Sequence, residues 1–297
     1  MKVAVTGAGG FLGQRLLPQL VSHRHDVEVV AFSSQDPDTL YSHDRIEYHD
    51  RKSATDEETM SGNEVLVHCA FPRATDGEAL AMGLAYNRDV FKAAVHARVT
   101  SIVNISSQSV YAINRATAAT EDTVVVPAGP YGLAKYASEM MVQSLPEPIK
   151  TVSLRVANLV GPGFNQRVLN KMADNALNNG HIEVTSPDTV VDLMDARDAA
   201  LAVVSIIGSR AWEAHDVINV GSGVPTSLET LAALVGAIVK QQTGHEVTVS
   251  TTARNPGSNS SMGIQRLRST TGFEARYSMK ATASDIVNDL WGRQKSE

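Results

Sequence analysis

The sequence has almost no cysteine. Cys69 is the only one among 297 residues, so an intrachain disulfide and a cysteine-based zinc site are both excluded, and we expect a reducing compartment and no metal. A long hydrophobic run is missing too, because no segment approaches the roughly 18 continuous apolar residues that a membrane-spanning helix requires. These two absences lead us to expect a cytoplasmic protein with no membrane partner.

An excess of positive charge is also missing. Lysine and arginine number 26 against 32 aspartate and glutamate residues, which gives a formal net charge of −6. This balance argues against a polybasic surface, so nucleic acid is not an expected partner and any phosphate would be held by a local group of residues. A hydrophobic content of 43% can supply the core of one large α/β domain, with or without a smaller annex.

Short runs rich in β-branched residues alternate with helical stretches through the first half of the chain. The expected strands are 3–6, 27–32, 45–49, 65–70, 101–106 and 151–156, and the clearest helical stretches between them are 12–20, 80–97 and 131–145. This alternation predicts an α/β protein with a doubly wound parallel sheet of the Rossmann type. We therefore assign residues 1–160 to a dinucleotide-binding domain, to which strands and helices near 190–221 return.

The pattern loosens after the Gly-Pro-Gly segment at 161–163. Helices are expected at 196–207 and 228–243, within segments rich in Asn, Ser, Thr and Gly. We interpret residues 161–297 as mainly a smaller, discontinuous substrate-binding cap. Because no linker separates it from the sheet, the cap should pack directly on the sheet and leave a cleft for the substrate.

A glycine-rich turn joins the first strand to the first helix. Gly7, Gly10 and Gly13 are spaced by three residues, with Phe11 and Leu12 between the last two. Glycine lets the backbone approach a ligand closely, and N–H groups at a helix N-terminus bind the pyrophosphate of a dinucleotide. This position in the chain predicts a cofactor site that includes all five residues.

Several separate motifs make the chain resemble the extended short-chain dehydrogenase/reductase family, the NAD(P)-dependent epimerases, dehydratases and reductases that act mainly on nucleotide sugars. The motifs are the glycine turn at 6–13, Val67-His68-Cys69-Ala70, Asn87, Ser106 to Tyr111, Tyr131-Gly132-Leu133-Ala134-Lys135 and the segment 154–163. The resemblance covers 1–165 well and the later residues less. It implies that Ala70 contacts the cofactor, whereas we expect His68 and Cys69 only to pack in the core.

Tyr131 and Lys135 are the expected catalytic pair. They lie four residues apart on one expected helix, so both side chains project from the same face. A tyrosine with an ordinary pKa near 10 is a poor catalyst at neutral pH, and we expect the Lys135 ammonium and the positive nicotinamide to lower that pKa. Tyr131 and Lys135 are also expected to contact the cofactor, and the resemblance implies that Lys135 holds the nicotinamide ribose. It also implies that Ser107, four residues before Tyr111, hydrogen-bonds the substrate oxygen.

The cofactor preference depends on the end of the second strand. NAD-specific relatives carry an acidic residue there for the adenosine ribose, but this chain has Ser33 and Ser34. Without that carboxylate a 2′-phosphate is not repelled, and the two hydroxyls could donate to it, so we favour NADP over NAD. The resemblance also implies that Asp50 and Arg51, after the third strand, lie near the adenine.

The resemblance implies that Asn158 and Arg254 contact the diphosphate of a nucleotide sugar. Many such enzymes carry a further arginine where this chain has Val191, and dehydratases carry an Asp-Glu pair where it has Gln108-Ser109. Dehydration is therefore disfavoured, and NADPH-dependent reduction of a 4-keto nucleotide sugar is our main hypothesis. The alternatives are an NAD-dependent nucleotide-sugar 4-epimerase, a reductase of a non-sugar carbonyl compound and a non-catalytic NAD(P)-sensing module.

Relatives of this kind commonly dimerise through the helices that follow the fourth and fifth strands. The corresponding stretches are 80–97 and 131–145. We therefore expect a homodimer.

Overall fold

The computed structural model describes residues 1–74, 76–164, 166–252 and 257–295, and its centre is a seven-stranded sheet. The strands are paired in the order β11-β6-β5-β4-β1-β2-β3, and every pairing is parallel. Along the chain they are β1 Lys2–Thr6, β2 Glu28–Ser33, β3 Ile46–Asp50, β4 Val65–His68, β5 Ser101–Ser107, β6 Lys150–Val156 and β11 Val217–Val220. This confirms the Rossmann-type α/β fold expected from the sequence.

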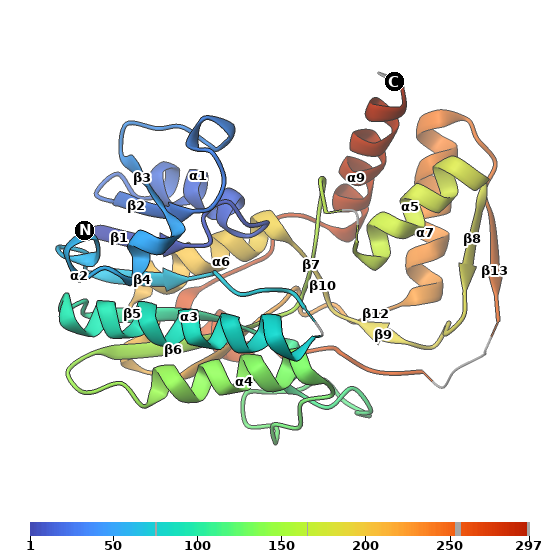
Figure 1. The fold of residues 1–297 in the computed structure, drawn as a ribbon. Helices are drawn as coiled ribbons and strands as arrows, with labels where there is room; N and C mark the ends of the chain where they lie inside the picture. Colours follow the sequence, from blue (N-terminus) through green and yellow to red (C-terminus); the bar gives the residue numbers. More distant parts are fainter. Residues whose placement is uncertain (75, 165, 253–256, 296–297) are drawn as a thin grey trace.

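Helices cover both faces of this sheet (Figure 1), because successive side chains of a strand point to opposite faces. In β1, Val3 and Val5 pack with α1 Gly13–His23 and α6 Ala196–Ser209 in one hydrophobic cluster. Ala4 packs on the other face with α3 Gly77–His96 and α4 Pro130–Gln143. Strands buried on both faces explain the continuous apolar runs in the sequence.

A second hydrophobic cluster lies beyond the carboxyl ends of the strands (Figure 1). It joins α5 Val168–Asn179, α7 Leu228–Thr243 and α9 Met279–Gln294 to the paired strands β8 His181–Val184 and β13 Thr248–Thr251. Two short pairs connect it to the sheet, namely β7 Asn158–Val160 with β10 Leu193–Asp195 and β9 Val190–Val191 with β12 Thr226–Ser227. The helices α5, α7 and α9 and the strands β8 and β13 all lie within residues 161–297, and their role as a substrate-binding cap stays a prediction.

The remaining helical elements are short. They are α2 Glu57–Met60, α8 Gln265–Thr271 and the 3-10 turns η1 Pro37–Thr39, η2 Arg51–Thr55, η3 Gln108–Val110 and η4 Ala211–Glu213. In the parts of the chain that the structure describes, no helix combines the length and apolar character needed to cross a membrane.

The helices α5 and α9 were not expected from the sequence, and β4 is shorter than expected. The strand ends at His68 rather than at residue 70, so Cys69 and Ala70 begin the segment that leads to α3. Because β1 and β4 are neighbours whose connections run to opposite sides of the sheet, this segment lies at the point where ligands bind in doubly wound sheets. The shorter strand thus places Ala70 directly opposite the glycine turn.

Candidate active site

The glycine turn is held by close backbone contacts. Gly7 has a φ of +70°, and a Cβ there would lie 2.7 Å from the backbone nitrogen of Ala70. A Cβ on Gly13 would lie 2.3 Å from the carbonyl oxygen of Gly7, so the first turn of α1 can pack on the end of β1 only with glycine at this position. The turn therefore needs glycine for its own geometry, and it leaves its backbone facing a cavity.

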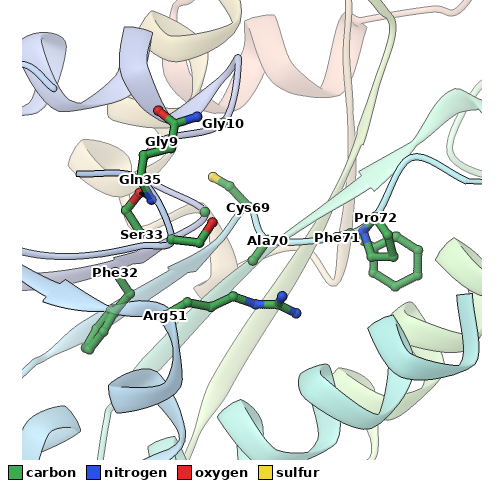
Figure 2. A pocket seen from close by; sticks show the side chains of 12 residues that line it. Gly9, Gly10, Phe32, Ser33, Gln35, Arg51, Cys69, Ala70, Phe71 and Pro72 are labelled. Carbon is green, nitrogen blue, oxygen red and sulfur yellow. Dashed lines mark hydrogen bonds between the residues drawn. The ribbon is translucent and has the colours of Figure 1, made fainter. Parts of the chain in front are cut away.

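This cavity of about 300 Å³ lies at the carboxyl ends of β1, β2 and β4. Figure 2 shows an elongated pocket, with Ser33 and Gln35 near Gly9 at one end and Phe71 and Pro72 at the other. Six of the residues predicted to bind the cofactor line it, namely Gly7, Gly10, Ser33, Ser34, Arg51 and Ala70. Its backbone lining and position suit a dinucleotide, because the open glycine turn can receive a pyrophosphate at the start of α1.

The other predicted cofactor residues lie around this cavity. The side chain of Leu12 is buried in the core, so only its backbone can reach a ligand. Phe11 points toward the cap, where its ring stacks on Phe164 with centroids 4.2 Å apart. Asp50 accepts a hydrogen bond from the backbone N–H of Lys52 at 2.8 Å and lines a neighbouring cavity together with Ser34 and Arg51.

Ser107 and Tyr131 line a second cavity, of about 580 Å³. Ser107 is the last residue of β5, and its hydroxyl oxygen accepts a hydrogen bond from the backbone N–H of Ser109 at 3.1 Å. Tyr131 lies in the first turn of α4, which begins at Pro130, a favoured first helical residue because its φ is preset. Asn158, at the start of β7, lines the same cavity. The structure therefore brings these three predicted residues together.

Lys135 lies buried behind Tyr131. Its ammonium donates a hydrogen bond to the carbonyl of Ile105 at 2.7 Å, and its Nζ is 4.4 Å from the ring centroid of Phe71 and 6.0 Å from that of Tyr131. Burial lowers the pKa of Lys135 to about 7, against the opposing effects of Cys69 and Glu139. Phe71 also meets Tyr131 edge to face, with centroids 6.2 Å apart, and was not anticipated from the sequence.

Burial dominates the electrostatics of Tyr131 in the protein alone. It raises the pKa of the phenol, and the groups that oppose this effect are Arg167, Arg73 and Ser107, in that order. Lys135 is directed to the Ile105 carbonyl. Desolvation therefore outweighs the nearby charges, and the lowering of the pKa that we expect from Lys135 together with the nicotinamide stays a prediction.

A buried ion pair joins β6 to α4, the helix that carries Tyr131 and Lys135. The Arg155 guanidinium donates to both carboxylate oxygens of Glu139, with the shortest contact at 2.8 Å, and both side chains are almost fully buried. Arg155 also donates to the hydroxyl of Tyr111 at 2.9 Å. Glu139 follows Lys135 by four residues on α4, so helical spacing alone could have placed it on the same face.

His68 takes part in a buried chain of hydrogen bonds. Its Nδ1 is 2.8 Å from the Thr6 hydroxyl, and its Nε2 is 2.8 Å from the side-chain oxygen of Asn87. The Asn87 amide then donates to the Ser138 hydroxyl on α4. Burial lowers the pKa of His68 to about 4, so the imidazole is neutral, with Nε2 as the assigned donor and Nδ1 as the acceptor.

Not all of the predicted substrate residues can be placed. Asn158 accepts a long hydrogen bond of 3.4 Å from Arg167. Arg254, the other residue expected at the diphosphate, lies outside the described residues. Val191 lies on β9 and provides no positive charge at the position where many nucleotide-sugar enzymes carry an arginine.

The model of the NAD dependent epimerase/dehydratase family matches residues 3–221, a range that contains the glycine turn, Ser107, Tyr131 and Lys135. The chain belongs to this family. It is therefore an enzyme of the NAD-dependent oxidoreductase type, as the resemblance to extended short-chain dehydrogenases implied.

Several relatives of this family are similar over nearly the whole chain. A UDP-glucose 4-epimerase of Corynebacterium glutamicum is 25% identical, over 98% of this chain and 95% of that protein. The structure of UDP-glucuronic acid 4-epimerase from Bacillus cereus in complex with NAD has a TM-score of 0.83 at 17% identity, covering 100% of this chain and 98% of the other. UDP-N-acetylglucosamine 4-epimerase, also from Bacillus cereus, has a TM-score of 0.82 at 20% identity, covering 99% of both chains.

Proposed function

We propose that this protein is an NAD-dependent nucleotide-sugar 4-epimerase. The observation that carries the proposal is the position of Ser107 and Tyr131, which line a polar cavity next to the glycine-lined cavity suited to a dinucleotide. The similar proteins named above are 4-epimerases, which favours this alternative over the reduction that we first expected from the sequence.

Inversion at a carbinol carbon requires its hydrogen to leave and to return on the opposite face, and a bound NAD supplies this chemistry by accepting and returning a hydride. The phenolate of Tyr131 would be favoured by the positive charge of bound NAD⁺ against the effect of burial. The phenolate takes the proton of the sugar hydroxyl as the carbonyl forms, and returns it when the hydroxyl forms again. Ser107 donates a hydrogen bond to the same oxygen and fixes its position. Lys135 uses one of its three N–H donors on Ile105, which leaves two for the ribose of the cofactor.

The lining of the second cavity supports a sugar rather than an apolar substrate. Apart from Ala74 and Ala157, its residues are polar or charged, namely Arg73, Asp76, Ser107, Ser109, Tyr131, Asn158, Gln166 and Arg167. A steroid or flavonoid would leave many of these groups without hydrogen bonds, at a cost of about 1–3 kcal/mol for each buried one. The presence of all three catalytic side chains also disfavours a non-catalytic sensing role.

A second candidate function is reduction of a 4-keto nucleotide sugar with NADPH. It is favoured by the end of the cofactor cavity, where Ser33 and Ser34 replace an acidic residue. Arg51 extends from the end of β3 into the same cavity, as Figure 2 shows, and its guanidinium stacks on Tyr86 at 4.3 Å. A guanidinium and two hydroxyls that line one cavity suit a 2′-phosphate.

Product analysis separates the two functions. The purified protein would be incubated with NAD and one nucleotide sugar at a time. The nucleotide sugars are UDP-glucose, UDP-N-acetylglucosamine and UDP-glucuronic acid, and their products would be identified by NMR. We expect the 4-epimer of at least one to form without accumulation of reduced cofactor. No interconversion, together with consumption of NADPH on a 4-keto nucleotide sugar, would instead establish the reductase.

We also propose a homodimer that buries the exposed faces of α3 and α4. Met82 on α3 and Leu133 and Met140 on α4 are large apolar side chains, each more than half exposed. The mass of the protein in solution, measured by light scattering, tests this assembly.

A further inference from the structure

Two arginines from separate segments line the second cavity together with Tyr131. Arg73 lies between β4 and α3, and Arg167 immediately precedes α5. Their guanidinium carbons are 5.4 and 5.0 Å from the centroid of the same ring, that of Phe164. Phe164 in turn stacks on Phe11 of the glycine turn, so the pair is held next to the boundary between the two cavities.

These guanidinium groups have unused hydrogen-bonding capacity. Of the five N–H donors that an arginine presents, Arg167 places one on Asn158 at 3.4 Å, and its buried Nε has no partner among the described residues. Within the same part of the chain, neither arginine forms an ion pair with a carboxylate. Arg73 is exposed, whereas Arg167 is partly buried, and a buried arginine nitrogen normally has a hydrogen-bond partner.

The positive charges of Arg73 and Arg167 also repel each other. Burial and the charge of Arg73 lower the pKa of Arg167 to about 10, which still leaves it protonated at neutral pH. Asp76 lines the cavity too, but its carboxylate caps α3 by accepting the N–H of Ala79 at 2.8 Å. Two like charges on one aromatic ring, with donors unused, are stabilised by an anion bound between them.

We propose that Arg73 and Arg167 form a subsite for an oxyanion carried by the substrate, an inference that rests on the proposed function. This chain has Val191 where many nucleotide-sugar enzymes carry an arginine. The two arginines bring positive charge into the cavity from other segments of the chain. The oxyanion is either the diphosphate or a carboxylate on the sugar ring. A carboxylate fits the fact that both arginines line the same cavity as Tyr131, where the reacting carbon would lie.

Calorimetric titration of the NAD-supplemented protein with UDP-glucose and with UDP-glucuronic acid tests the subsite. The variants are Arg73→Gln, Arg167→Gln, the double variant and the conservative Arg167→Lys, and each is first checked for native circular dichroism. Arg88→Gln is the matched control, because Arg88 is exposed on α3 and pairs with Asp89 outside the cavity. We expect each Gln variant to weaken binding at least about tenfold, as the loss of charge-assisted hydrogen bonds predicts.

The pattern over the two probes identifies the anion. Equal weakening for both nucleotide sugars assigns the arginines to the diphosphate, and weakening confined to UDP-glucuronic acid assigns them to the sugar carboxylate. Affinities within twofold of wild type in the double variant, or no binding of either probe by the wild type, would overturn the subsite. Epimerisation is measured separately, so a protein with arginine-dependent binding but no interconversion refutes the proposed function and keeps the subsite.

Discussion

The two cavities at the carboxyl edge of the sheet are built in different ways. The cofactor cavity is lined by backbone at the turn that follows β1, because Gly7, Gly9 and Gly10 carry no side chains. The second cavity is lined mainly by side chains from separate segments, with Arg73 after β4, Tyr131 on α4 and Arg167 before α5. The shape of the cofactor cavity at the glycine turn thus depends on the backbone conformation. The shape of the second cavity depends on the conformations of long side chains.

This difference predicts how each cavity responds to change. A Cβ on Gly7 or Gly13 would clash with neighbouring backbone atoms, so the glycine turn tolerates very little substitution. Long polar side chains can be exchanged without disturbing the core, so substrate preference can change while the fold and cofactor site persist. The following predictions test this contrast.

The largest effect is expected from one hydroxyl group in the second cavity. Tyr131→Phe should lower turnover by about 10²–10⁴-fold, because it removes the proton donor and acceptor. Affinity for NAD should stay within a few-fold, since the phenol belongs to the substrate cavity. Steady-state kinetics and cofactor titration measure the two quantities. Near-normal turnover in this variant would refute the assigned mechanism.

The next largest effect concerns the backbone wall. Gly13→Ala places a Cβ 2.3 Å from the Gly7 carbonyl oxygen and 2.6 Å from that of Ala8, neither of which can move without shifting the turn. We expect a loss of about 1–3 kcal/mol in the free energy of unfolding, typical of overpacking, and weaker NAD binding. Gly77→Ala is the matched control, because a Cβ there meets nothing within 4 Å. Denaturant titration of both variants makes the comparison, and equal stabilities would contradict it.

The same contrast explains which parts could be predicted from the sequence. The sheet could be predicted because runs rich in β-branched residues, such as 101–106, are buried on both faces and therefore have a distinct composition. The glycine turn and the Tyr131–Lys135 pair could also be proposed from spacing, since a turn or a helix fixes the relation between neighbours along the chain. In both cases the information is local.

Arg73, Phe71 and Phe164 could not be assigned in this way. Their segments have no helical or strand period, and tertiary contacts decide where their side chains point. Phe71 and Pro72 are held against α3 at Gly83, where a Cβ would come within 2.6 Å of the proline ring. Arg51 was expected near the adenine, and its closeness to Ser33 follows from β2 and β3 being paired neighbours.

A smaller effect should appear in the pH dependence. Arg167 is the leading group that lowers the pKa of Tyr131 against the effect of burial, so Arg167→Gln should raise that pKa further. Oxidation of the sugar hydroxyl needs the phenolate, so its rate rises with pH up to the pKa of Tyr131. The ascending limb of the pH profile of kcat should therefore move to higher pH, by up to about one unit. The Arg88→Gln control should not shift, and an unmoved limb in Arg167→Gln would separate this arginine from the chemistry.

The smallest effect is expected at the far end of the cofactor cavity, where a side chain rather than backbone meets the ligand. Arg51→Gln should weaken NADPH binding about tenfold, equivalent to about 1.4 kcal/mol, because it removes a cation from beside Ser33 and Ser34. NADH affinity should change less than twofold, since NADH has no 2′-phosphate. Ser34→Asp should act in the same direction by repelling that phosphate. If both variants leave the ratio of the two affinities unchanged, other residues determine the cofactor preference. The side chains at this end of the cofactor cavity would then not select the ligand, in contrast to those expected to do so in the second cavity.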